Sequence, residues 1–242
     1  MTAALLALVV FGAFTIEALA GFGSTVLAVA VGVHLLPLPT LLAALVPVNL
    51  ALSLLLVLRH WRHLDLRLLL RDVLPWMALG LPLGLWLLGR LPEALLLGVF
   101  AVFVLATSLA ELRTVAPRPL PSPLGAALLC AGGVIHGAYA SGGPMVVYVL
   151  TRTTPDKARF RTTLSALWLV LNAALVLGYA FSGAFDRHTA TLSAALVPSL
   201  ALGLFTGERL HDKVSPPAFR RLVLVLLALA GALLLIRTGG LL

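Results

Sequence analysis

The sequence predicts an all-α polytopic membrane protein with two inverted repeats, each a broken or re-entrant helical hairpin followed by three transmembrane helices. Composition is the first observation: 61% of the residues are hydrophobic and 11% are charged, and the mean hydropathy is +1.09. A soluble domain has roughly half apolar and a quarter charged residues. The second observation is that the apolar runs are continuous and rich in Leu and Ala, unlike the alternating strands of a barrel. The third is a residue pattern that recurs in the two halves.

The first half, residues 1–115, begins with an apolar run that is broken near its middle. This run, 3–36, is interrupted by Gly21-Phe22-Gly23-Ser24. It has no basic region at its start and it matches an internal segment, so we expect it to remain in the mature protein. Three further runs approach the roughly 20 residues that a spanning helix needs; they lie at 41–58, 73–89 and 94–112.

The second half, residues 124–242, repeats this order after a proline-rich linker at 116–123. Closely spaced prolines are poorly suited to helix, so the linker is a natural boundary. A run at 124–150 is interrupted by Ser141-Gly142-Gly143-Pro144. Spanning runs then follow at 162–181, 189–208 and 218–236.

The two halves correspond at a nearly constant offset across several runs. Chance supplies single matches in a chain rich in Leu and Ala, but a shared offset across three runs indicates an internal repeat. The matched pairs are Gly12 with Gly132, Gly23 with Gly143, Asn49 with Asn172, Pro75 with Pro198, Gly80 with Gly203, and Gly84 with Gly207.

The basic residues predict that each broken segment returns to the side from which it entered. With that topology, all of the 17 Lys and Arg residues except Arg90, Arg187 and Arg237 face the cytoplasm. If each broken segment crossed once, the bias would nearly vanish, and the positive-inside rule prefers the first arrangement. Equivalent loops then lie on opposite faces, which makes the repeat inverted. Whether the hairpin arms cross fully or stop near mid-membrane stays open, because the parity is the same.

The net charge of +8 does not indicate a nucleic-acid partner. The basic residues lie in short loops, where they orient the protein and contact the lipid bilayer. The single cysteine, Cys130, excludes an intramolecular disulfide, and no Cys/His cluster has the spacing of a metal site. We therefore expect no metal and no cofactor.

The two breaks are the best candidates for a binding site. Irregular backbone survives in a membrane only where protein or a polar cavity surrounds it, and paired breaks in two halves are typical of transporter sites. Each second arm would present free N–H groups and the positive end of its dipole near mid-membrane, which favours a small anion. The candidates are Gly21, Gly23, Ser24, Thr25, Ser141, Gly142 and Gly143. The alternative is a helix kink or tight glycine packing.

Further polar residues near the breaks have two interpretations each. Glu17 and His136 could carry a coupling proton or ion; alternatively, Glu17 is solvated or paired with Arg, and His136 is a hydrogen-bonded core residue. Asn49 and Asn172 either join helices through hydrogen bonds or line the site. Tyr139 either lines or gates the site or is a packing residue. Arg159 and Arg161, with Thr162, Thr163 and Ser165, either form a funnel for anions or simply orient the protein, and orientation is the simpler explanation.

The second broken segment resembles the signature of a known family. The run from Gly132 to Leu150, the continuation from Lys157 to Thr163, and then Asn172 resemble the second repeat of the sulfite exporter TauE/SafE family. The first half is less similar: the family often has a three-glycine motif where this chain reads Gly21-Phe22-Gly23-Ser24-Thr25.

This resemblance implies a secondary transporter that exports a small sulfur oxyanion across the bacterial inner membrane by alternating access. The family is associated with sulfite and with organosulfonates such as sulfoacetate. Transport of another small anion and a non-transporting membrane scaffold are the alternatives, while the coupling ion and the oligomeric state, a homodimer included, stay open. An intramembrane hydrolase that uses Ser24 or Ser141 with His136 is the alternative from another class. We expect no enzymatic activity, because His136 and Ser141 are five residues apart along a helix, which is poor alignment for a nucleophile and its base.

Overall fold

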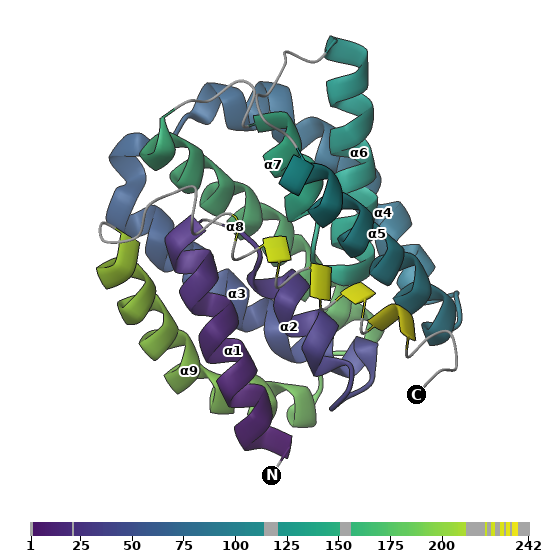
Figure 1. Ribbon diagram of the computed structural model, residues 1–242. Coiled ribbons are helices and arrows are strands. Elements are labelled where there is room, and N and C mark those ends of the chain that lie inside the picture. The colour runs from purple at the N-terminus through teal and green to yellow at the C-terminus, as the bar shows by residue number, and fades with distance from the viewer. Residues whose placement is uncertain are drawn as a thin grey trace.

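In the computed structural model, the described residues form a bundle of helices (Figure 1). They are 2–20, 22–113, 121–150 and 156–211, followed by 221, 224, 225, 228, 229, 231, 232 and 234–236. Within these ranges all regular structure is helical, so the predicted all-α class is confirmed. The elements are α1 (Thr2–Ala20), α2 (Ser24–Gly32), α3 (Leu38–His60), η1 (Trp61–His63), η2 (Leu68–Val73), α4 (Leu74–Leu88), α5 (Glu93–Arg113), α6 (Ser122–Tyr139), α7 (Gly143–Leu150), α8 (Lys157–Ser182) and α9 (Arg187–His211).

Among the described residues, five helices are long and apolar enough to cross a membrane, which makes the chain a multi-pass membrane protein. They are Leu38–His63, Leu68–Leu88, Glu93–Ala110, Ala158–Ser182 and Arg187–Leu210. They occupy five of the six predicted spanning segments, and only separate, non-contiguous parts of the sixth, 218–236, are described. The predicted linker was too long at its end: α6 already begins at Ser122, because Pro123 is tolerated in the first helical turn.

Both predicted breaks are present, and each separates a long arm from a short one. Gly23 ends the first break with φ 101°, a left-handed conformation that favours glycine. Ala140 has φ 50° and closes α6. The second arms, α2 and α7, have nine and eight residues. At 1.5 Å per residue each is about 13 Å long, under half of the roughly 30 Å hydrocarbon core.

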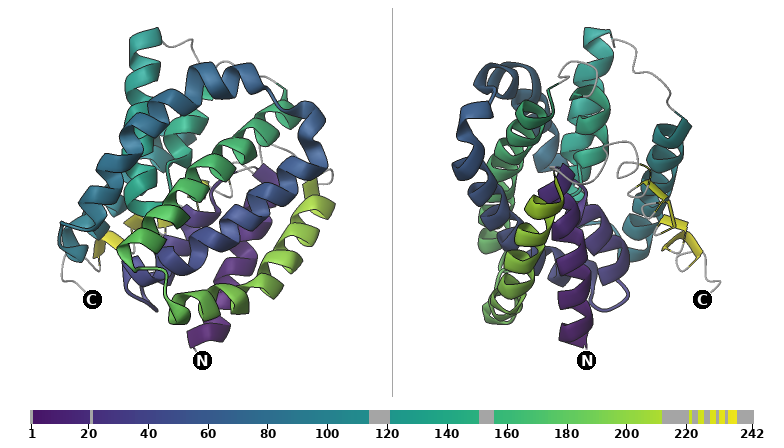
Figure 2. Two further views of the ribbon diagram at one scale, coloured as in Figure 1. Left: turned by 180° about the vertical axis from the view of Figure 1, so that it is seen from behind. Right: turned by 60° about the vertical axis from the view of Figure 1, so that its left-hand side comes forward.

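The two hairpins enter the bundle from opposite ends. In the view of Figure 1, α1 begins at the lower end and α6 at the upper end, and Figure 2 shows the same relation from two further sides. Packing follows the predicted correspondence: α1 lies against α9, α6 lies against α4, and α3 lies against α8. These observations agree with an inverted repeat, and the repeat relation itself stays a prediction.

Glycines allow near backbone-to-backbone contact at the two equivalent helix pairs. A Cβ atom at Gly84 would lie 2.0 Å from the carbonyl oxygen of Val134, and one at Gly133 would lie 2.1 Å from that of Met77. At Gly207 a Cβ would lie 2.6 Å from the carbonyl oxygen of Thr15. Small residues that let helices approach closely are typical of membrane helix interfaces. The glycines that match between the two halves therefore lie at the α4–α6 and α1–α9 contacts.

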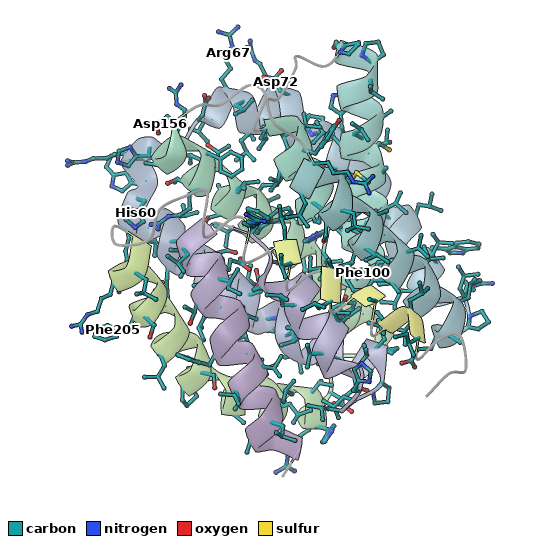
Figure 3. The ribbon with its side chains drawn as sticks, in the orientation of Figure 1. His60, Arg67, Asp72, Phe100, Asp156 and Phe205 are labelled. Atoms are coloured by element: carbon teal, nitrogen blue, oxygen red, sulfur yellow. The ribbon has the colours of Figure 1, made fainter. Side chains whose placement is uncertain are left out.

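Ion pairs join the predicted basic loops at one end of the bundle. Arg59 at the end of α3 pairs with Glu208 near the end of α9. Arg159 at the start of α8 approaches Asp65 at 3.6 Å. Figure 3 shows His60, Arg67, Asp72 and Asp156 toward the upper end of the bundle. This end is therefore the candidate cytoplasmic face.

Labelling of introduced cysteines tests that topology. In a Cys130→Ala background, we expect Arg62→Cys to react with a membrane-impermeant maleimide only after cells are permeabilised. His188→Cys, in the first turn of α9, should react in intact cells, because α8 carries the chain to the other end. Reaction of both cysteines from the same side would contradict the arrangement.

Candidate functional site

A small polar pocket lies where the two breaks meet. Its volume is about 20 Å³, enough for about one water-sized sphere. Both halves contribute to its wall, which is lined by Glu17, Gly23, Thr25, Val26, Asn49, His136, Ala140, Ser141, Gly143, Trp168 and Asn172. Residues far apart in the chain thus converge on one pocket.

Glu17 is held at this pocket by neighbours from the first half. Its side chain is 3% exposed, and its Oε2 accepts hydrogen bonds from the Ser24 hydroxyl and from Asn49 Nδ2, the latter at 3.0 Å. Asn49 Nδ2 also lies 2.9 Å from Ser24 Oγ and 3.3 Å from Thr25 Oγ1. The alternative of a solvated or arginine-paired Glu17 is therefore wrong.

The two equivalent asparagines bond directly to each other. Asn172 Nδ2 donates to Asn49 Oδ1 at 2.7 Å, joining α8 to α3. Ser53 Oγ donates to the same Asn49 oxygen at 3.3 Å. Both asparagines also line the pocket. The asparagines therefore do both things that the sequence left as alternatives: they join two helices, and they lie in the pocket wall.

His136 presents an unpartnered nitrogen in this wall. The residue is 2% exposed, and its ring stacks on Trp168 with centroids 5.2 Å apart and planes 16° apart. Its Nδ1 accepts a long hydrogen bond of 3.5 Å from the Gly142 N–H. Its buried Nε2 has no hydrogen-bond partner among the described residues. Since Nδ1 accepts, the neutral ring carries its proton on Nε2, as a donor. His136 is therefore a buried histidine with a hydrogen bond at Nδ1, and its role in coupling stays a prediction.

Two helix N-termini reach the pocket. Gly23 precedes α2 and makes no side-chain cap, and Gly143 begins α7. Both glycines line the pocket. The first turn of a helix has N–H groups without intrahelical acceptors and the positive end of the dipole. The pocket therefore lies at two partially positive helix ends, as the breaks predicted.

Some predicted residues lie elsewhere. The Tyr139 hydroxyl donates to the Leu96 carbonyl oxygen at 2.7 Å, and its ring stacks on Phe100, so it packs outside the pocket wall. Gly142 does not line the pocket, but its N–H donates to His136 Nδ1. A Cβ at Gly142 would lie 2.5 Å from the Gly132 carbonyl oxygen. Gly21 lies outside the described residues. No group of three or more potential metal-binding side chains occurs among the described residues.

Sequence reasoning missed Trp168. A signal existed, because Trp168 precedes Asn172 by four residues and residues so spaced share one face of a helix. Its ring forms the support for His136 and part of the pocket wall. The fold therefore provides the imidazole with an aromatic plane on one side.

Comparison with known proteins gives two matches. The family model described as sulfite exporter TauE/SafE matches residues 6–234. The "Probable inner membrane transporter protein TsaS" of Comamonas testosteroni is 34% identical over 167 residues, which cover 66% of this chain and 68% of that protein. No solved structure matches the chain significantly. The resemblance seen in the sequence is confirmed.

The asparagine contacts predict an order of stabilities. Asn49→Ala removes the amide that bonds Glu17, Ser24 and Asn172, leaving buried polar groups unsatisfied, and we expect it to lower the free energy of unfolding by about 1–3 kcal/mol. Asn172→Ala removes one of these bonds and should cost less. Denaturation in detergent micelles measures both. Equal losses, or a larger loss for Asn172→Ala, would show that Asn49 is not the centre of the network.

Proposed function

The chain belongs to the sulfite exporter TauE/SafE family, and we propose that it exports a small sulfur oxyanion across the bacterial inner membrane as a secondary transporter. Sulfite or an organosulfonate such as sulfoacetate is the proposed substrate. The family match and the similarity to a probable inner membrane transporter support this class of function. A negative-inside potential favours anion efflux by about 2.3 kcal/mol per charge per 100 mV.

The unpartnered Nε2 of His136 is the observation that carries the proposed site. A buried donor without an acceptor is costly unless something else accepts its proton, and an oxyanion bound in the pocket would do so. The N-terminal turns of α2 and α7 add partial positive charge without placing a full charge in lipid. The Thr25 hydroxyl, which accepts from Asn49, has its own proton to donate. An oxyanion would thus meet donors from both hairpins.

Access to this site requires movement. A pocket of about 20 Å³ holds about one water-sized sphere and is too small for an anion with several oxygens. The wall combines residues of the two oppositely directed hairpins with residues of α3 and α8. In the proposed alternating-access cycle these parts would separate toward one face and then the other. The Asn49–Asn172 bond joins α3 to α8 in this wall.

Glu17 is the proposed coupling group. Its carboxylate, when ionised, would repel an anion in the same small pocket, whereas its protonated form would not. We therefore assign to Glu17 the proton that accompanies or exchanges with the substrate, and His136 is the second titratable group of the wall.

A hydrolase is not supported by the serine contacts. Ser24 donates to Glu17, and Ser141 donates to the Tyr139 carbonyl oxygen at 2.8 Å. Neither serine bonds to His136 among the described contacts, so the nucleophile–base pair that such an enzyme needs is not formed. The buried His136 Nε2 without a partner among the described residues costs stability, and a non-transporting scaffold would gain nothing in return.

Flux through liposomes tests the site. His136→Phe keeps an aromatic ring against Trp168 but removes the Nε2 donor, and we expect it to raise the KM for labelled sulfite about tenfold or more, because hydrogen bonds to charged groups contribute about 1.5–3 kcal/mol. Tyr179→Phe is the matched control: it removes another buried polar atom without a partner, but this one lies outside the pocket wall. Equal effects of the two variants would refute the site.

Selectivity decides between the substrate alternatives in the same assay. Wild-type protein should transport sulfite or sulfoacetate faster than sulfate or a carboxylate. Faster transport of sulfate or the carboxylate would show that the proposed substrate is wrong. Equal, non-selective flux of all four anions would refute the proposal that the protein is a transporter.

The coupling proposal predicts a change with Glu17→Gln. The amide can satisfy Ser24 and Asn49 but does not titrate, so substrate flux should no longer respond to an imposed pH gradient while the substrate still binds. Initial rates at several pH gradients give the comparison with wild type. A variant that follows the gradient as steeply as wild type would exclude Glu17 from coupling.

A further inference from the structure

A second, larger pocket opens at the basic end of the bundle. Its volume is about 410 Å³, and its wall is formed by the ends of α3 and α9, the start of α8 and η1. The lining residues are Arg59, His60, His63, Ala158, Arg161, Thr162 and Glu208. His60, labelled in Figure 3, marks this region at the left of the view. We refer to this pocket as the vestibule.

The charge of the vestibule is mainly positive and partly buried. Two arginines face one carboxylate, and two histidines complete the polar part of the wall. Arg161 is only 7% exposed, unlike an arginine that merely orients the protein at the lipid surface. The His60 Nε2 is buried without a hydrogen bond and lies 3.6 Å from Glu208 Oε1. Charges of one sign along low-dielectric walls concentrate the field and raise the local concentration of counter-ions.

Arg161 connects the vestibule with the central pocket. Its Nη1 donates to the Ala18 carbonyl oxygen at 3.0 Å, in the last turn of α1. The neighbouring residue, Glu17, lines the central pocket. The vestibule therefore borders the same helix end whose break forms the central site.

The opposite end of the bundle has the reverse character. A pocket of about 540 Å³ there is lined by Val33, His34, Leu35, Leu36, Pro37, Glu93, Ala94 and Leu97. Its wall contains a glutamate and, among the described residues, no lysine or arginine. The two mouths of the bundle thus differ in the sign of their charge.

We propose that the vestibule is an anion-docking site that receives the oxyanion from the cytoplasm before it enters the central pocket. This inference rests on the proposed function and deepens it, because it assigns a path and a direction to the substrate. The contrast between the mouths raises the anion concentration at the cytoplasmic side and lowers it at the other side. From the sequence alone, the simpler explanation of Arg159 and Arg161 was that they orient the protein in the membrane. Arg161 is, however, buried and lines a cavity, which favours a role in anion binding.

Two variants of one ion pair test the proposal. Arg59 and Glu208 pair with each other across the vestibule. We expect Arg59→Gln to raise the KM for labelled sulfite about threefold and Glu208→Gln to lower it about threefold, with little change in kcat, since an exposed charge contributes up to about 1 kcal/mol. Initial uptake rates in inverted membrane vesicles, where the cytoplasmic face is outside, give these values. A purely structural role of the pair would shift both variants in the same direction.

The controls separate this inference from the function itself. Arg187→Gln, at the opposite end, should leave the KM unchanged, and the two opposite shifts should shrink as salt screens the charges. Selective flux in wild type with unchanged or parallel KM values in the two variants would overturn the vestibule alone. Absence of selective flux in wild type would instead overturn the proposed function.

An anionic lipid headgroup offers the same chemistry as the substrate. Proteoliposomes of phosphatidylcholine, with and without phosphatidylglycerol, distinguish the two sources. Opposite KM shifts that persist without phosphatidylglycerol support docking of the transported anion. Shifts that appear only with the anionic lipid would identify a headgroup site and overturn the proposal.

Discussion

The hydrogen bond between Asn172 and Asn49 is the contact around which the polar interior is arranged. In lipid every buried polar group needs a partner inside the protein, and Asn49 supplies one to Glu17, Ser24 and Ser53 as well. The bond joins α3 to α8, two helices that belong to different halves and pack against each other. It therefore holds the two halves in register at the point where their breaks meet.

The proposed binding of an anion depends on the hydrogen-bond donors near the pocket that this network leaves without an acceptor. Glu17 and both asparagines have partners, while His136 Nε2 has none among the described residues. His136 lines the pocket together with Gly23 and Gly143, at the N-terminal ends of α2 and α7. Donors that are fixed in advance bind an anion without the cost of rearranging side chains. The same fixed contacts explain why the pocket is so small, and why transport would require them to open in turn.

Hydropathy and the positions of glycine and proline were enough to predict the helices and the two breaks, and they singled out Glu17, Ser24, Asn49 and Asn172 as candidates. These features depend on period and position, which a sequence displays directly. Side-chain direction does not: Tyr139 is adjacent to the break, yet its hydroxyl bonds to Leu96. The burial of Arg161 depends on the packing of α8 against the end of α1, a contact between distant segments that composition cannot reveal. The lengths of α2 and α7 were open for the same reason, because apolar sequence continues beyond the helix ends.

The glycine contacts determine which parts of the bundle can move together. Where Gly84 and Gly133 bring the backbones of α4 and α6 into contact, no side chains remain to slide past one another, and α1 is joined to α9 in the same manner. Each hairpin is thereby fastened to a helix encoded in the other half of the gene product. In the proposed transport cycle, each hairpin would then move together with a helix from the other half of the sequence. The moving bodies would not coincide with the two sequence halves that the linker divides.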